Sequence, residues 1–588
     1  MNENSSKPCL IKTSQGFCVK YKEKFLYSKY NPQKTILNLI EKIELLPGTI
    51  IIAASPVMPY GIKNLIEKIE ILPGTIIIAA SPVMPYGIKK LIEKLPRDCI
   101  ILAVEFDANL FEFSKPYLEE YSNFSPEKIQ ILSKNDILNF HKLLQQKNPC
   151  LENGFLLPPH GTFKRAVKID FSGGVQFHKE LYESFLQTVQ NAIGTFFKNQ
   201  ITLSKFARKY FHNLFRNMTK IPDSVPLKSL EKSVSKPILI LGTGSSVEDT
   251  LEKIKNNFNR FFIISLDATV PALKDYKIHC DAVICEECQC VISKMFIGSH
   301  KTFPLAITGL TSAPKTVSFS TKELSYFIPF FADCTALKNI ISMKNFPPKI
   351  NPFGSVGITA LYFALFLRKN NTIPIFFSGL DFSFENNFTH AKNSLPYKNL
   401  LFMQNKIKPI QNLSPVFAEG NLKILDKNKK TVNTTKALLN YSQLFSLFEN
   451  EKNLFDIRKK GLKLNIKDGI IFFEEILNSE IKQEPSTIKF NHFSEEEKIE
   501  LKQEIRAFFL QEINALEEAK KILKGEVNIS ENEKTKKLKA IFIPREYLYL
   551  HFPDGYKFSL DLSFLKRVRA EMDFFLKEFK TDLTLLDD

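Results

Sequence analysis

The 588-residue sequence has no tryptophan, only 22 glycines and no long apolar run. Its longest apolar stretches, such as residues 50–54 and 361–367, fall far short of the ~20 residues that a bilayer span needs. The first residues, MNENSSKPCLIK, lack the apolar core of a secretory signal. These absences predict a cytoplasmic protein without a membrane span.

The nine cysteines do not form a disulfide framework, because an odd number in a large chain fits free thiols better. One cluster could suggest a metal site: within twelve residues lie His279, Cys280, Cys285, Cys288 and Cys290. Strand alternation over 280–285 would place Cys280 and Cys285 on different faces, and a structural zinc site normally uses two separated ligand pairs. We therefore expect thiols here and no metal.

Basic residues exceed acidic residues by 80 to 63, which gives a formal net charge of +17. Such a field favours anionic partners. The chain is also rich in Ile, Asn and Phe, as expected from an A+T-rich genome, and it has no nucleic-acid reader motif. We therefore interpret the positive charge as a general feature of the composition, and we predict no nucleic-acid partner.

A nearly verbatim internal repeat lies near the N-terminus. Residues 38–63 recur as 64–89, with Leu45 replaced by Ile71 as the only change. A solenoid needs at least three repeats, so we interpret this as one tandem duplication. The repeated unit encodes a buried-type strand, a loop and a helix, and a second strand over 99–105 ends on Glu105. This βαβ unit lacks a Gly-x-Gly loop, which favours a scaffold over a dinucleotide site. Whether both copies join one sheet is left open.

Hydrophobic periodicity divides the chain into three predicted domains. Residues 1–225 form a Rossmann-like α/β domain with a helical extension. Residues 237–425 alternate strands and helices, which predicts a mostly parallel sheet covered on both faces. Residues 430–588 are mainly helical, with a short hairpin expected over 461–473. The predicted fold class is α/β with a helical C-terminal domain.

Polar clusters follow the strands of the central domain. Gly242 and Gly244 follow the first strand and let the backbone approach a ligand, and Ser245 with Glu248 has capping-box spacing. The helix that follows would present free N–H groups to an anion such as phosphate. Gly354 with Ser355 repeats this arrangement before the helix over 356–367. A tight strand-to-helix turn without a ligand is the alternative for the first loop, and two convergent helix starts favour a phosphorylated ligand more than either does alone.

Three acids also follow strands: Asp267, Glu287 and Asp381. Such acids serve as bases, ribose hydroxyl acceptors or metal ligands, and each alone also suits a loop cap. His390 stands in a polar loop nine residues after Asp381, where an imidazole suits acid–base work or phosphate contact, with an ordinary surface histidine as the alternative.

In order and spacing, these motifs resemble the central domain of the motility-associated factor (Maf) glycosyltransferases. The motifs are GTGSSV at 242–247, DAVICEE at 281–287, FGSV at 353–356, and GLDFSF at 379–384 followed by THA at 389–391. That domain is also called DUF115 or MptE-like, after an archaeal 6-hydroxymethylpterin diphosphokinase.

The resemblance implies a central fold similar to bacterial sialyltransferases. It also implies transfer of a nonulosonic acid, of pseudaminic or legionaminic type, from its CMP-activated form to Ser/Thr of flagellin. We expect no cofactor and no metal, because helix N-termini can stabilise the single phosphate of CMP.

Site roles follow from the same resemblance. We expect Gly242, Gly244, Ser245 and Ser246 on the nucleotide phosphate or ribose. Asp267 is a further substrate-binding candidate, and Glu287 would orient nucleotide hydroxyls. Gly354 and Ser355 would lie near the sugar, with Asp381 and His390 as acid–base candidates.

Some residues depart from the family pattern. The usual Gly-x-Gly-Pro-Ser-Leu is Gly-Thr-Gly-Ser-Ser-Val here, Glu287 replaces a common Asp, and SPVMPYG replaces an N-terminal Gly-rich loop. Two alternative functions stay open. One is an ATP-dependent pyrophosphoryl transfer with Mg²⁺ held by Asp267, Glu287 and Asp381. The other is a non-catalytic flagellin-binding protein.

Overall fold

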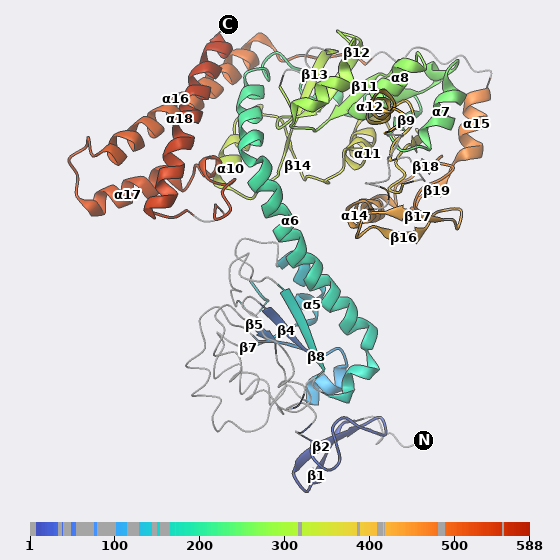
Figure 1. The fold of residues 1–588 in the computed structure, drawn as a ribbon, viewed down its shortest axis with the longest axis vertical. Helices are drawn as coiled ribbons and strands as arrows, with labels where there is room; N and C mark the ends of the chain where they lie inside the picture. Colours follow the sequence, from blue (N-terminus) through green and yellow to red (C-terminus); the bar gives the residue numbers. More distant parts are fainter. Residues whose placement is uncertain are drawn as a thin grey trace. The chain divides into compact units, whose positions relative to one another are not determined.

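The chain forms two compact units in the computed structural model, residues 1–202 (unit 1) and 203–588 (unit 2) (Figure 1). Apart from a few single positions, the structure describes residues 7–32, 49–54, 76–78, 101–113, 129–143, 150–152, 165–170, 172–314, 320–384, 389–407, 418–479, 488–555 and 558–587. The boundary between the units falls inside helix α6 (Lys179–Met218), whose second half belongs to unit 2.

Unit 1 combines a small antiparallel sheet with a parallel sheet. The antiparallel strands are β1 (Cys9–Thr13), β2 (Gly16–Tyr21) and β3 (Lys24–Phe25). The parallel sheet contains β4 (Thr49–Ala54), β5 (Ile76–Ile78), β6 (Ile101–Val104), β7 (Ile129–Ile131) and β8 (Arg165–Asp170). Helix α5 (Lys134–Leu143) follows β7 along the chain. These parallel strands agree with the Rossmann-like class predicted for this part of the chain.

Both copies of the repeat contribute a strand to the parallel sheet. Strands β4 and β5 pair in parallel, with Ile50 opposite Ile76. These two positions are equivalent in the two copies, since 76 − 50 = 26 is the repeat offset. Strand β4 also pairs with β6 through residues 52–54 and with β8 along its whole length. The loop SPVMPYG of each copy and the helix predicted at 88–95 lie outside the described residues.

Unit 2 is built around a sheet of nine parallel strands. Their spatial order is β14-β13-β12-β11-β10-β9-β15-β18-β19. In chain order they are β9 (Ile238–Leu241), β10 (Phe262–Leu266), β11 (Ala282–Cys285), β12 (Phe303–Gly309), β13 (Thr321–Pro329), β14 (Lys349–Ile350), β15 (Ile375–Ser378), β18 (Leu454–Asp456) and β19 (Lys467–Asp468). A two-stranded hairpin, β16 (Leu422–Leu425) with β17 (Thr431–Thr434), stands apart from this sheet.

Strand alternation produces two apolar faces, because successive side chains point to opposite sides. Ile238 and Ile240 of β9 face a core that includes helix α11 (Val356–Leu367). Leu239 and Leu241 face a second core with α7 (Val247–Ile254), α8 (Val270–Asp275) and α15 (Ile470–Asn478). The sheet is therefore the middle of three layers, as predicted for the central domain.

The C-terminal region is helical, as predicted. Helices α16 (Glu495–Lys524), α17 (Glu531–Phe542) and α18 (Leu562–Asp587), drawn in red to orange in Figure 1, share one apolar core with the second half of α6 and part of β13. Capping boxes begin α16 at Ser494 and α17 at Ser530, and Gly525 ends α16 in the left-handed conformation.

Two expectations for this end of the chain are wrong. The hairpin over 461–473 does not form, because β19 pairs in parallel with β18 and the chain then enters α15. Strands β18 and β19 also extend the central sheet, so this sheet continues past residue 430. Within the part of the chain that the structure describes, no helix is long and apolar enough to cross a bilayer.

Candidate functional site

The direction of chain winding changes between β9 and β15. In the strand order of the sheet, β10 to β14 lie on one side of β9, whereas β15, β18 and β19 lie on the other side of β9. Loops that leave neighbouring strands in opposite directions open a crevice at the carboxyl ends, which is where ligands bind in open α/β sheets. The predicted loop at 242–246 follows β9, and the predicted loop at 379–381 follows β15.

These two loops are packed against each other through glycine backbone. The Gly244 N–H donates to Gly379 O at 2.7 Å, and the Gly242 N–H donates to Ser378 O at 2.8 Å. A Cβ added to Gly242 would lie 2.4 Å from Gly379 O, and one added to Gly244 would lie 2.6 Å from Asp381 Oδ2. Both glycines are thus required by loop-to-loop packing, and their role in approaching a ligand stays a prediction.

Asp381 holds the N-terminus of α7. Its Oδ2 accepts a hydrogen bond of 2.9 Å from the Ser246 N–H, and its Oδ1 accepts one from the Ser246 hydroxyl. The Ser246 oxygen in turn accepts from the Gly379 N–H at 2.9 Å. A carboxylate of the chain itself therefore lies where a phosphate was expected, and phosphate contact by Ser245 and Ser246 stays a prediction. Burial raises the pKa of Asp381, opposed by the nearby Arg458 guanidinium and the hydrogen bonds from Ser246.

The capping box predicted for Ser245 and Glu248 does not form. Ser246 is the N-cap residue of α7, and the Glu248 carboxylate accepts instead from the Lys392 N–H at 2.7 Å. This bond ties the segment after His390 to the first turn of α7.

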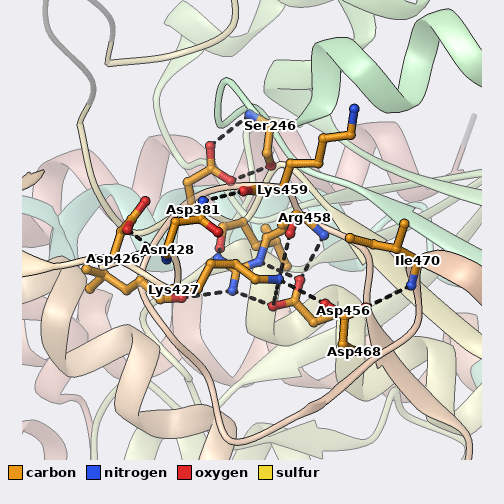
Figure 2. Close-up of polar contacts among 12 residues, drawn as sticks. Ser246, Asp381, Asp426, Lys427, Asn428, Asp456, Arg458, Lys459, Asp468 and Ile470 are labelled. Atoms are coloured by element: carbon orange, nitrogen blue, oxygen red, sulfur yellow. Dashed lines mark hydrogen bonds and ion pairs between the residues drawn. The ribbon is translucent and has the colours of Figure 1, made fainter. Parts of the chain in front are cut away.

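A buried ion pair between Asp456 and Arg458 lies next to the loop that carries Asp381 (Figure 2). The Arg458 guanidinium binds Asp456 through two bonds of 2.9 Å and donates to Leu380 O at 2.6 Å. Although burial acts to raise it, the pKa of Asp456 is held below its usual range by Arg458 and by Lys427. This pair was not among the predicted site residues. Its pattern in the sequence is Asp456-x-Arg458, with Asp456 as the last residue of the short strand β18.

Two acids, the buried Asp267 and the half-buried Glu286, follow adjacent strands on the α11 side of the sheet. Asp267 follows β10 and is 6% exposed, and among the described residues its Oδ2 atom has no hydrogen-bond partner. Burial raises the pKa of Asp267 to about 6. Glu286 follows β11 and accepts from the Thr359 hydroxyl of α11 at 2.8 Å. Burial, together with the charge of Asp267, raises the pKa of Glu286 to about 7. The two carboxyls are thus close enough to repel each other when ionised.

Both Glu286 and the predicted Glu287 lie close enough to Asp267 to interact with it: the charge of Asp267 raises the pKa of Glu286, and the charge of Glu287 adds to the effect of burial in raising the pKa of Asp267. The Glu287 carboxylate accepts from the Gln289 N–H at 2.8 Å, which is an ordinary turn contact. Glu286 has the same strand register as Ala282 and Ile284, which face α11. The alternation of side chains along the strand therefore indicates that Glu286 lies on the α11 side. The predicted role of Glu287 in orienting nucleotide hydroxyls stays untested.

The N-terminus of α11 lies at the same edge of the sheet. Ser355 is its N-cap residue, and its side chain makes no capping hydrogen bond. Gly354 has φ +72°, and a Cβ there would lie 3.0 Å from the Tyr441 ring. A Cβ added to Gly357 would lie 2.6 Å from Leu380, so the first turn of α11 packs against the loop after β15. The first N–H groups of α11 therefore have no side-chain cap.

The residue after His390 is hydrogen-bonded to the loop that carries Gly242 and Gly244. The Ala391 N–H donates to Thr243 O at 2.8 Å, and His390 Nδ1 lies 3.0 Å from the Thr389 hydroxyl. Partial burial lowers the pKa of His390 below its ordinary value, which favours the neutral imidazole. The structure thus gathers the segments that carry Gly242, Gly244, Asp381 and His390.

The cysteine cluster does not assemble a metal site. In the described ranges no group of three or more His, Cys, Asp and Glu side chains could hold a metal ion. Cys280, Cys285 and Cys288 are buried free thiols, whereas Cys290 is exposed.

These features define a three-layer α/β protein with a candidate site at the switch point of its sheet. Residues 210–387 match the family model described as 6-hydroxymethylpterin diphosphokinase MptE-like, which is the domain that the sequence motifs resemble.

Two proteins are similar over nearly the whole chain. An uncharacterized protein of Treponema pallidum (strain Nichols) is 26% identical over 586 residues, covering 97% of this chain and 94% of the relative. The structure of the MAf glycosyltransferase from Magnetospirillum magneticum AMB-1 matches with a TM-score of 0.50 and 12% identity. It covers 99% of this chain and 91% of that chain. At this identity the match shows a common fold, shared with a protein of the class that the sequence motifs resemble.

Proposed function

We propose that this protein is a glycosyltransferase that binds a nucleotide-activated sugar at the carboxyl edge of the unit 2 sheet. The observation that carries the proposal is the meeting of the 242–246 loop, the 379–381 loop and the uncapped start of α11 at the switch point. N–H groups at that place suit a leaving phosphate. The fold similarity to a MAf glycosyltransferase supports the same reaction class.

The proposed donor is a CMP-activated nonulosonic acid, and the proposed acceptors are Ser/Thr hydroxyls of flagellin. Both come from the motif resemblance. Because the leaving group carries one phosphate, N–H donors can stabilise it, and we propose a reaction without metal or cofactor. Modification of flagellin before export would place the enzyme in the cytoplasm.

His390 is the better placed of the two acid–base candidates. A base must be unprotonated at working pH and able to take the acceptor proton. The half-buried imidazole of His390, whose pKa is lowered, suits the first condition. Both Asp381 oxygens already accept hydrogen bonds from Ser246, which suits a positioning role for this carboxylate. We propose that His390 is the base and that Asp381 sets the loop geometry.

Asp267 and Glu286 are the proposed contacts to donor hydroxyls. The Oδ2 atom of Asp267 has no hydrogen-bond donor among the described residues by geometry, and in this proposal a sugar or ribose hydroxyl donates to it. In this proposal Glu286 takes over the role that the sequence assigned to Glu287.

The second candidate is a pterin diphosphokinase reaction. The family model match at 210–387 and the acid pair Asp267 and Glu286 favour it, since carboxylates can hold the Mg²⁺ that pyrophosphoryl transfer from ATP needs. A non-catalytic flagellin-binding protein is the remaining alternative.

The test is the intact mass of purified flagellin after incubation with the protein and a CMP-nonulosonic acid. A mass increase equal to whole sugar residues supports the proposal, and its loss with His390→Gln assigns the base. His279→Gln is the matched control, because His279 is exposed and lies before β11, at the opposite edge of the sheet. No mass change, with ATP and a pterin converted under the same conditions, would replace the glycosyltransferase by the diphosphokinase.

A further inference from the structure

The second half of α6 is fastened to the loops at the carboxyl edge of the sheet. Asn213 and Asn217 lie one helical turn apart and are 3% and 2% exposed. The Asn213 amide donates to Cys288 O at 3.0 Å and to Thr311 O at 2.8 Å. The Asn217 amide donates to Leu310 O and Ser312 O, both at 2.9 Å. Two side chains thus satisfy four carbonyl groups.

The carbonyls belong to the loops after β11 and β12. Cys288 stands two residues after Glu286, and residues 310–312 directly follow β12. The two loops are also joined to each other, because the Ala313 N–H donates to Glu287 O at 3.0 Å and the Ser312 hydroxyl donates to Cys285 O at 3.0 Å. The position of Glu286 is therefore set by a network whose outer members are on α6.

A third residue on the same face of α6 lies near the acids. Tyr210 precedes Asn213 by three residues. Burial raises its pKa, with further contributions from Cys288, Glu287 and Glu286. The adjacent face of α6 has a different partner: Arg208, His212 and Arg216 pair with Glu571 and Glu578 of α18. One face of α6 thus contacts α18, and the other contacts the candidate site.

Asparagine is a costly choice in a helix interior, because its amide competes for backbone hydrogen bonds and loses solvent when buried. A leucine of similar size would fill the same space without that cost. Two buried asparagines at this spacing are explained if the loop carbonyls need donors that the loops themselves do not supply.

We propose that α6 is a structural part of the donor site, with Asn213 and Asn217 as positioning residues that hold the loops after β11 and β12 and so fix the Glu286 carboxyl. This inference rests on the proposed function for its kinetic consequence. Its structural part can be tested without any activity.

The structural test uses the thiols of the full-length protein. Cys288 and Cys280 are 4% and 3% exposed, and only Cys288 is in the loop held by Asn213. We expect Asn213→Leu to speed alkylation of Cys288 by iodoacetamide about tenfold or more, with Cys280 unchanged, because two buried carbonyls lose their donor and the loop opens locally. Peptide mass spectrometry gives both rates. Asn339→Leu is the control, since Asn339 is exposed on helix α10 (Thr335–Ile341).

The kinetic test separates positioning from general damage. If Asn213 positions Glu286, Asn213→Leu raises the KM for the sugar donor about tenfold, whereas partial unfolding lowers kcat and leaves KM unchanged. If the leucine variant does not fold, Asn213→Ser, which keeps one donor, replaces it and is expected to show intermediate values.

Equal acceleration at Cys288 and Cys280, or no acceleration at either, would overturn the proposal. So would an unchanged KM in a protein that transfers sugar. If the wild-type protein transfers no sugar, the proposed function fails while the alkylation rates still decide whether α6 holds these loops.

Discussion

The backbones of Gly242 and Gly379 are so close that neither residue has room for a side chain. A Cβ on Gly242 would lie 2.4 Å from Gly379 O, and a Cβ on Gly379 would lie 2.3 Å from Gly242 O. Gly379 also has φ +74°, which only glycine adopts without strain. This mutual contact brings the carboxyl ends of β9 and β15 together and determines where the candidate site lies.

Gly242→Ala is expected to destabilise unit 2 by about 3 kcal/mol, because the obstructing atoms are backbone and cannot move aside cheaply. Thermal unfolding followed by circular dichroism measures the change. Gly194→Ala is the control: Gly194 is inside α6 with nothing within 4 Å of an added Cβ. There alanine should stabilise by up to about 1 kcal/mol. Equal effects of the two substitutions would contradict the packing account.

Ser246 and Ser245 should differ sharply although they are neighbours. Ser246→Ala removes the acceptor of the Gly379 N–H and a donor to Asp381, so we expect a loss of about 2 kcal/mol in stability. Ser245 makes only a 3.5 Å contact with Asp381, and Ser245→Ala should cost less than about 0.5 kcal/mol. Urea unfolding of both variants gives the comparison. A larger loss for Ser245→Ala would mean that Asp381 is held differently.

Glu286 should make stability depend on pH. Its folded-state pKa of about 7 is above the ordinary value of 4.5, so the folded protein binds more protons than the unfolded chain between these values. Stability from this group therefore falls as pH rises from about 4.5 to 7, by an amount on the order of 2 kcal/mol. Glu286→Gln should remove this part of the slope, with Glu287→Gln as the matched control. Urea midpoints across that range test it, and identical slopes for wild type and Glu286→Gln would contradict the assignment.

The pH dependence of sugar transfer should report on His390. Because burial lowers its pKa from 6.5, the rate should stay high at pH 7 and fall only when the pH drops below that ordinary value. His390→Gln should lose about a hundredfold in kcat and the acid limb with it. His279→Gln should retain both. An acid limb that survives in His390→Gln would assign the base to another group, with Asp381 as the next candidate.

Local sequence patterns were sufficient for the layers of the fold but not for all of its connections. Apolar runs such as 238–241 and 375–378 are typical of strands that are buried on both faces, and the structure has strands there. The polar residues at the ends of these strands could be predicted from their position in the sequence. The short strand β19 has only two residues, and its parallel pairing with β18 depends on the surrounding sheet. A pattern read along the chain therefore suggested a hairpin there.

The sequence predicted only part of the site, because local patterns do not show contacts between distant segments. Gly242, Asp381 and His390 are brought together because their loops leave adjacent strands or contact each other. Arg458 and Asn213 were missed, since each acts through carbonyl groups that are 78 and 98 residues away along the chain. Glu286 was not among the predicted site residues, although it shares the strand register of Ala282 and Ile284.

The most direct test of the account is a calorimetric titration of the full-length protein with CMP, with and without Mg²⁺. We predict saturable CMP binding that does not need Mg²⁺ and is weakened by Glu286→Gln. Binding of ATP that requires Mg²⁺, with no binding of CMP, would contradict the glycosyltransferase account and favour the diphosphokinase.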